Sequence, residues 1–303
     1  MKYIEQGYKG ELGLWKYIII PFCFIGLMAL NYLAVVLLNI DVEKLMALEI
    51  ERKGELRVFI DLMWPMGIAL VVLLVWVKYI HKQSIVSLTT SRDKIDWKRV
   101  FFSFSLWAII TSTLIFVDYK LNPEDYQWNF ELSSFLGLLV AALILVPLQT
   151  SFEEYLFRGY LMQGVGIATK SSLAALLFTS FLFGIMHIAN PEVEKIGYGI
   201  MVYYIGTGLF LGITALMDDG IELCLGFHAA NNLVTALLVT STWTALQTPS
   251  VLKDTSTPGL GWDVFVPVLV VFPILLFIFS KIYKWTDWKE KLTGKIEKPV
   301  TIQ

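Results

Sequence analysis

Eight apolar runs divide the chain, and most of them approach or exceed the ~20 residues that a helix needs to cross a bilayer. They cover residues 14–40, 59–80, 100–117, 133–150, 172–189, 198–217, 222–241 and 263–283. The runs leave no stretch long enough for a separate soluble domain. Hydrophobic residues make up 56% of the chain, above the ~45–50% apolar content of soluble domains. The sequence therefore predicts one integral membrane domain over 1–303, an all-α polytopic transmembrane helical bundle with about eight spans.

The distribution of basic residues predicts how this bundle is oriented. With the N-terminus inside, Lys and Arg divide 17 to 7 between inner and outer segments, which favours cytoplasmic N- and C-termini. Four of the seven outer residues lie in 41–58, expected to form a charged amphipathic helix, and these count against that orientation. The first run is too long for a cleavable signal peptide and is expected to act as a signal anchor. With no organelle signal, the pattern favours a bacterial cytoplasmic membrane.

The most informative motif is Glu153-Glu154-x-x-x-Arg158, directly after the fourth run. Ionisable groups in or beside the hydrocarbon cost at least about 2.5 kcal/mol each, so they usually have a function. If 152–165 continues helically from the fourth span, Glu154 and Arg158 share a face. Glu153 is then turned by about 100° from Glu154. One carboxylate can be neutralised by Arg158 while the other faces a cavity.

A histidine, His187, lies in the fifth run, and the preceding turn is predicted at 169–172. Glu153 is about 17 residues before the middle of that turn and His187 about 17 after it, so an antiparallel helix hairpin brings both side chains to the same level. A carboxylate facing an imidazole can polarise a water molecule between them or share a metal ion.

A third motif pairs His228 with Asn232 at i+4, and Asn231 at i+3 could replace Asn232 geometrically. A histidine beside an amide can stabilise a developing oxyanion, or act as a metal ligand with its supporting partner. One feature conflicts with a single site. His187 and His228 differ in depth by roughly 13 Å unless helices tilt, start elsewhere, or 189–198 re-enters.

These three motifs resemble the CPBP family of CAAX proteases and bacteriocin-processing enzymes, also called the ABI family, whose signatures are EExxxR, FxxxH and HxxxN/D. The residues that match are Glu153, Glu154, Arg158, Phe183, His187, His228 and Asn232. The resemblance covers about 135–240, which we expect to be the catalytic core. It implies an intramembrane endopeptidase, with a membrane-associated protein or peptide as substrate. The lipid bilayer is the other expected partner, and no nucleic acid is expected.

The resemblance also implies roles for these residues. By analogy with the Ras-converting CAAX endoprotease, Glu153 and His187 would activate water, His228 and Asn232 would form the oxyanion hole, and Glu154 and Arg158 would support them. The family is often described as metal-dependent, but a metal-free glutamate mechanism is also argued for it. Glu153, His187 and His228 would make a zinc set, zinc being the divalent metal expected, with the fourth position left for water.

Two other classes of function stay open. The first is a non-catalytic membrane immunity or scaffold protein of the same family. The second is a transporter that uses the carboxylates and histidines as a proton relay, although no inverted repeat supports it. His81, in a basic loop, is predicted to be solvated, and Asp218, Asp219 and Glu222 are predicted to be solvated helix caps.

Overall fold

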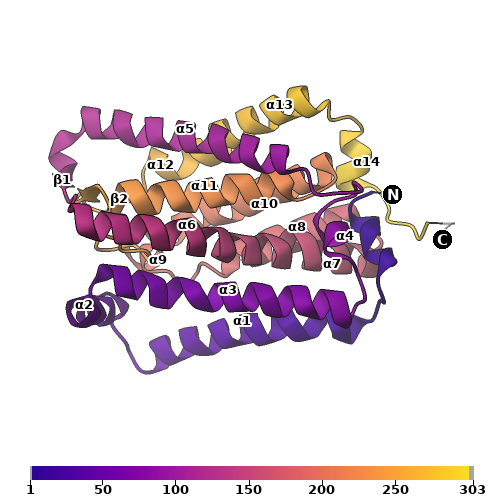
Figure 1. Cartoon of the computed structure of the whole chain (residues 1–303), viewed down its shortest axis with the longest axis horizontal. Coiled ribbons are helices and arrows are strands. Elements are labelled where there is room, and N and C mark those ends of the chain that lie inside the picture. Colours follow the sequence, from indigo (N-terminus) through magenta and orange to yellow (C-terminus); the bar gives the residue numbers. More distant parts are fainter. Residues whose placement is uncertain (1, 300–303) are drawn as a thin grey trace.

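A helix overlaps each of the eight apolar runs, in a computed structural model that describes residues 2–299 (Figure 1). The helices are α1 (Leu14–Leu37), α3 (Glu55–Tyr79), α5 (Trp97–Leu121), α6 (Leu132–Glu154), α8 (Ser172–Ile185), α10 (Met201–Asp218), α11 (Glu222–Leu238) and α13 (Phe272–Tyr283). A short helix, α12 (Trp262–Val266), and a π-helical segment, Pro267–Val271, lead into α13. The prediction of an all-α helical membrane bundle is confirmed.

Not every helix is long enough to cross a bilayer unaided. Within residues 2–299, six helices have the length and apolar character of a membrane span. Helix α8 has 14 residues and α11 has 17, so both fall short of the usual length. Helix α11 carries His228 and Asn232 of the predicted active site, and His187 follows the end of α8.

Both termini lie at one end of the bundle, which we call the terminal end (Figure 1). The inter-helix segments of this end pair with one another, since Thr90 bridges to Gly220 and Ser171 to Lys295. Its short helices are a 3-10 helix (Ile4–Lys9), α4 (Ile85–Thr89) and α14 (Trp288–Thr293). Both termini on one side agree with an even number of passes. Placement of this end in the cytoplasm stays a prediction.

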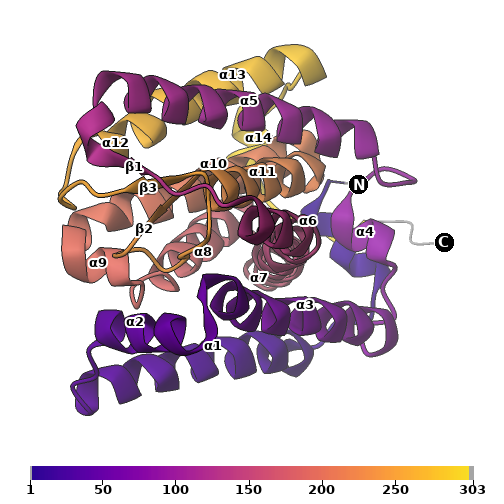
Figure 2. The same ribbon diagram turned by 60° about the vertical axis from the view of Figure 1, so that its left-hand side comes forward.

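The opposite end, which we call the sheet end, holds a small three-stranded sheet (Figure 2). Its elements are α2 (Val42–Lys53), a 3-10 helix (Pro123–Asp125), β1 (Tyr126–Trp128), α9 (Pro191–Ile196), a 3-10 helix (Tyr198–Ile200), β2 (Val239–Ser241) and β3 (Leu252–Asp254). Strand β3 is central, antiparallel to β1 and parallel to β2. The sequence predicted none of these strands and placed β2 within the apolar run 222–241, because three-residue strands are too short to show an alternating pattern.

Close helix packing fixes the positions of the motif-bearing helices. Helix α11 packs against α5 and α6, and α10 packs against α8. A Cβ on Gly226 would lie 2.1 Å from the Val100 carbonyl oxygen, and one on Gly208 would lie 2.5 Å from that of Ser180. Only glycine allows the backbones to approach this closely, as at many membrane helix crossings.

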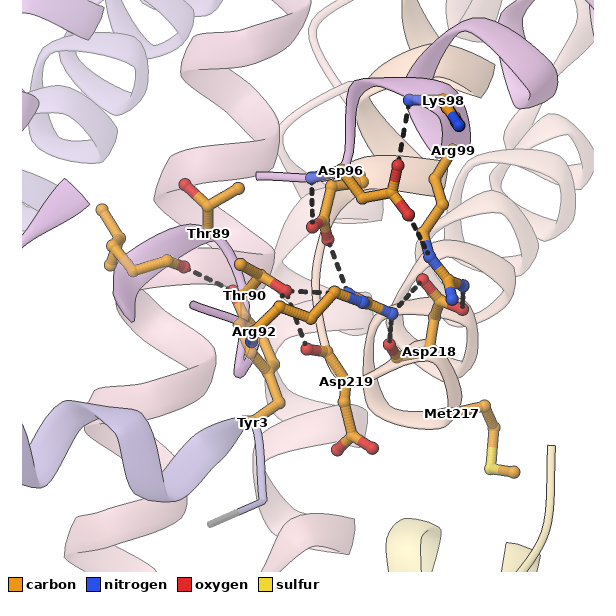
Figure 3. Close-up of polar contacts among 12 residues, drawn as sticks. Tyr3, Thr89, Thr90, Arg92, Asp96, Lys98, Arg99, Met217, Asp218 and Asp219 are labelled. Atoms are coloured by element: carbon orange, nitrogen blue, oxygen red, sulfur yellow. Dashed lines mark hydrogen bonds and ion pairs between the residues drawn. The ribbon is translucent and has the colours of Figure 1, made fainter. Parts of the chain in front are cut away.

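The predicted solvated caps of α10 and α11 are instead buried, which corrects the sequence analysis. Asp218 is 3% exposed and Glu222 is fully buried. Figure 3 shows Arg92 and Arg99 reaching Asp218, and Arg92 also pairs with Glu222 at 3.2 Å. The prediction failed because the 90–96 segment and the start of α5 fold over these helix ends. Their arginines, Arg92 and Arg99, lie more than 100 residues before Asp218 in the sequence. Asp219 alone stays partly exposed, paired with Lys291 at 2.6 Å.

His81 is buried too, with 1% of its surface exposed, so its prediction as a solvated residue was wrong. Its Nδ1 lies 3.1 Å from the carbonyl oxygen of Glu11, and its Nε2 lies 2.9 Å from the Tyr160 hydroxyl. The N-terminal segment covers the ring and excludes water from it. This burial lowers the pKa of His81 below its ordinary value.

Candidate active site

The helix that carries Glu153 and Glu154 continues without a break beyond α6, as predicted. The continuation is a π-helical segment, Tyr155–Leu161, followed by α7 (Met162–Thr169). Such π-helical turns within α-helices are frequent at functional sites. The turn to α8 falls at the predicted place, with Lys170 in the left-handed conformation and the Ser171 side chain capping α8.

Glu154 and Arg158 form the predicted ion pair, with 2.8 Å between Oε1 and Nη1, and both side chains are fully buried. Arg158 also donates to the Gly208 carbonyl from Nη2 at 3.2 Å and lies 4.2 Å over the Phe183 ring. Contacts to both α8 and α10 therefore hold the guanidinium in place. A buried ion pair needs such additional contacts to offset the loss of hydration.

His228 links this ion pair to the second glutamate. Its Nδ1 lies 2.7 Å from Glu154 Oε1, and because a carboxylate only accepts, Nδ1 carries the proton. Its Nε2 faces Glu153 Oε2 at 3.6 Å. When His228 is protonated, the formal charges of these two glutamates, Arg158 and the imidazolium cancel. The two carboxylates thus have different surroundings. Arg158 balances the charge of Glu154, whereas the ionisable group opposite Glu153 is His228.

Glu153 lines a cavity of about 570 Å³, and Glu154 and Arg158 do not. This confirms that the two glutamates face in different directions. The same cavity is lined by the other predicted site residues, His187, His228, Asn231 and Asn232. Its walls come from α1, α3, α6, α8, α10 and α11, and residues 239–246 cover it at the sheet end. The structure thus brings every cavity-facing residue of the three motifs to one place.

A chain of side-chain amides leads across this cavity to Glu153. Trp107 Nε1 donates to Asn231 Oδ1 (3.1 Å), Asn231 Nδ2 to Asn232 Oδ1 (3.1 Å), Asn232 Nδ2 to Gln149 Oε1 (3.0 Å), and Gln149 Nε2 to Glu153 Oε1 (2.6 Å). An indole can only donate and a carboxylate can only accept, so the two ends fix the orientation of every amide.

This chain answers a question that spacing left open. Asn232 contacts Gln149 directly, and Asn231 acts one step behind it, so both asparagines belong to the network. Sequence reasoning missed Gln149 altogether. The available signal was its position one helical turn before Glu153, on the same face of α6.

His187 follows the end of α8. It lines the same cavity as His228, although the sequence spacing predicted a difference in depth between these two residues. Its Nδ1 lies 2.8 Å from the Phe183 carbonyl oxygen, which only accepts, so Nδ1 donates and the neutral ring keeps a lone pair on Nε2. The ring stacks on Tyr204 at 4.5 Å. The Phe183 ring lies 4.9 Å from that of His187 and 6.0 Å from that of His228. One phenylalanine therefore packs against both imidazoles.

The three residues of the predicted zinc set do not converge. Among residues 2–299, no three His, Cys, Asp or Glu side chains are placed to hold one metal ion. Only Glu153 and His228 approach each other, and His228 Nδ1 is bonded to Glu154. A catalytic zinc site needs three protein ligands, so this arrangement does not fit one. It does provide hydrogen-bonding groups around a space that can hold water.

Comparison with known proteins matches residues 132–234 to the family model described as "Type II CAAX prenyl endopeptidase Rce1-like". This range contains every residue of the three motifs, so the family resemblance is confirmed. A protein of Bacillus subtilis (strain 168), "Uncharacterized protein YyaK", is 29% identical over 290 residues, covering 93% of this chain and 95% of the relative. No solved structure matches the chain. Together with the long apolar helices, the family match supports an integral membrane protease.

Proposed function

We propose that the chain is an intramembrane endopeptidase acting on a membrane-associated protein or peptide, on the premise that residues 132–234 match the Rce1-like family model. One observation carries the proposal. Glu153, nearly buried, opens into a cavity that also holds two imidazoles and the end of an amide chain. A carboxylate that faces a largely apolar cavity can act as a general base. Peptide hydrolysis within a membrane requires such a base to take a proton from water.

Water activation is the first step of the proposed mechanism. Gln149 holds Glu153 Oε1, which leaves Oε2 to accept a proton from a water molecule in the cavity. His187 Nε2 keeps its lone pair and accepts the second hydrogen of that water. The water oxygen then attacks the peptide carbonyl carbon as its proton passes to Glu153.

The developing oxyanion needs donors on the other side of the carbonyl. His228 in its protonated form donates from Nε2, while Nδ1 stays bonded to Glu154. Asn232 supplies a second N–H, because its amide gives only one hydrogen to Gln149. Removing one such donor typically lowers kcat by about 10²–10³-fold. When the C–N bond breaks, Glu153 returns its proton to the leaving amine.

The proposed mechanism needs no metal, and a chelator tests that point. We expect cleavage by purified enzyme to survive chelation, with no stoichiometric zinc bound. Loss of activity on chelation, restored by zinc alone, would contradict the metal-free mechanism and bring Glu153, His187 and His228 together as ligands.

The decisive experiment is cleavage of a fluorogenic, membrane-anchored peptide library by enzyme in proteoliposomes. Glu153→Gln is the test variant because it keeps the shape and the Gln149 contact but cannot accept a proton. Glu124→Gln, on an exposed residue of the sheet end, is the matched control. Cleavage by wild type and control but not by Glu153→Gln supports the peptidase. Equal cleavage by all three would reject it and favour the scaffold or immunity protein.

The proposed location is a bacterial cytoplasmic membrane with the terminal end inside. The 17-to-7 division of Lys and Arg supports this orientation. Residues of the sheet end line the cavity, so in this orientation the cavity would lie in the outer half of the bilayer. A C-terminal alkaline phosphatase fusion should be inactive, and an active fusion would reverse the orientation.

A further inference from the structure

A third glutamate, Glu192, lines the same cavity from the short helix α9 at the sheet end. Its Oε1 accepts the backbone N–H of Ala245 at 2.9 Å. Its Oε2 is buried and has no hydrogen-bond partner within residues 2–299. Glu192 also forms no ion pair in this part of the chain, unlike Glu153 and Glu154. Glu192 Oε2 therefore lies in the cavity wall without a hydrogen bond to any of the described residues.

An unpartnered buried carboxylate oxygen is unfavourable, because the group has lost its hydration without replacement. Burial accordingly raises the pKa of Glu192. The nearby Tyr204 hydroxyl accepts from Asn190 at 3.4 Å, and within residues 2–299 it makes no hydrogen bond to Glu192 Oε2. Buried groups left in this condition are concentrated at functional sites, where a ligand completes them.

The composition of the cavity indicates which ligand does so. Its lining includes three carboxylates, from Glu153, Glu192 and Asp254, and neither a lysine nor an arginine. Such a cavity attracts positive charge and disfavours anions. Aromatic residues, including Tyr204 and Trp243, line the same cavity, and aromatic rings also favour cations at short range.

Tyr204 connects this region with the proposed catalytic groups. Its ring stacks on His187, and Asn190, two residues before Glu192, donates to its hydroxyl. A peptide with its scissile carbonyl at Glu153 and His228 would therefore extend along Tyr204 toward Glu192. Glu153, His228, Tyr204 and Glu192 all line this one cavity.

We propose that Glu192 forms a cation-binding subsite of this cavity, which takes a Lys or Arg side chain or a free α-ammonium group of the substrate. The ligand supplies the counter-charge and the hydrogen bonds that Glu192 Oε2 lacks. This inference rests on the proposed peptidase function for its meaning, but the binding it describes can be measured without cleavage.

The test compares peptides that differ only in a Lys, an uncharged norleucine or a Glu at successive positions near the cleaved bond, each with a free or an acetylated N-terminus. Glu192→Gln removes the charge and keeps an oxygen for the Ala245 N–H. Glu194→Gln is the matched control, since Glu194 is exposed on the same short helix. We expect wild type and control to prefer one cationic peptide by about tenfold in kcat/KM, as for a charged hydrogen bond. Glu192→Gln should bring the ratio of kcat/KM for the cationic peptide to that for the norleucine peptide close to one.

A binding arm keeps failure of this inference separate from failure of the peptidase proposal. Fluorescently labelled cationic and norleucine peptides are titrated onto Glu153→Gln and onto the Glu153→Gln/Glu192→Gln double variant. Preferential binding of the cationic peptide that depends on Glu192 supports the subsite even if nothing is cleaved. A preference that is absent in wild type, or unchanged by Glu192→Gln in both arms, overturns it.

Discussion

The bundle has two buried polar clusters, one at each end, and they differ in how fully their carboxylates are bonded. At the terminal end, Asp218 binds Arg92, Arg99 and the Trp285 indole, and Glu222 binds Arg92 and the backbone N–H of Asp96. Every carboxylate oxygen of these two residues has a partner. Near the sheet end, by contrast, one oxygen of Glu154, which lies behind the cavity wall, and one oxygen of Glu192, which lines the cavity, have none among residues 2–299.

This difference separates a structural role from a functional one. A fully bonded cluster has no capacity left for a ligand, so its groups stabilise the positions of α5, α10 and α11. A partly bonded cluster is less stable on its own and gains from a water molecule or substrate. The two clusters hold a similar number of buried carboxylates. The difference between these carboxylates is whether all of their oxygens have hydrogen-bond partners.

The largest effect is expected for Glu153→Gln, which should lower kcat by about 10³-fold, within the range of general-base catalysis. Its thermal unfolding temperature should stay equal to that of wild type or rise, because the substitution removes a charge that Arg158 does not balance. Both quantities are measured on the same detergent-purified sample. A large loss of thermal stability would show that Glu153 is a structural residue. It would contradict the division between a structural cluster at the terminal end and a functional one near the sheet end.

Arg158→Met should have the next largest effect, this time on stability. Methionine fills part of the space but leaves Glu154 as a buried, unbalanced charge, which typically costs about 3–5 kcal/mol. Chemical unfolding in mild detergent gives the free energy of unfolding. The double variant Arg158→Met/Glu154→Gln serves as control and should recover much of the loss. A single variant as stable as wild type would show that Glu154 has other compensation.

Arg99→Met in the terminal cluster should be milder. Arg99 is partly exposed and Asp218 keeps Arg92 and Trp285, so we expect a loss of about 2 kcal/mol, as for one charged hydrogen bond. The cleavage rate per folded molecule should not change. A decrease in kcat at full occupancy of the folded state would show that the two clusters are coupled, against the division argued above.

The parts of this site that the sequence predicted follow from local helix geometry. The pair Glu154–Arg158, the opposite facing of Glu153 and the turn at Lys170 depend on 3.6 residues per turn and on nearby turn residues. The same rule would have found Gln149 one turn before Glu153. These features need no information about distant parts of the chain.

The parts of the site that could not be predicted depend on which loop folds over which helix end. Asp218 and Arg92 are 126 residues apart, and Glu192 meets Ala245 across 53 residues. Hydrophobic periodicity describes which face of a helix is buried, but not which segment covers its end. Polar residues at helix ends therefore looked solvated in the sequence, although several of them are buried.

The smallest expected effect concerns His81, the residue whose burial was least expected. Its folded-state pKa lies below its unfolded value of about 6.5, so between those two pKa values the unfolded chain binds more protons. Stability contributed by neutral His81 is therefore present above pH 6.5 and is lost as the pH falls toward the folded-state pKa.

Thermal unfolding of wild type between pH 5 and 8 should thus show a decline at the acid side that is shallower in His81→Gln. The other groups facing this ring are Lys16, whose charge also disfavours the imidazolium, together with Glu11, the Tyr17 ring and the Tyr160 hydroxyl. Taking the difference between the two proteins removes the titration of His187 and His228, which both proteins share. Parallel curves would mean that the N-terminal segment already admits water to His81. In that case the terminal end would be less tightly closed than its bonded cluster implies.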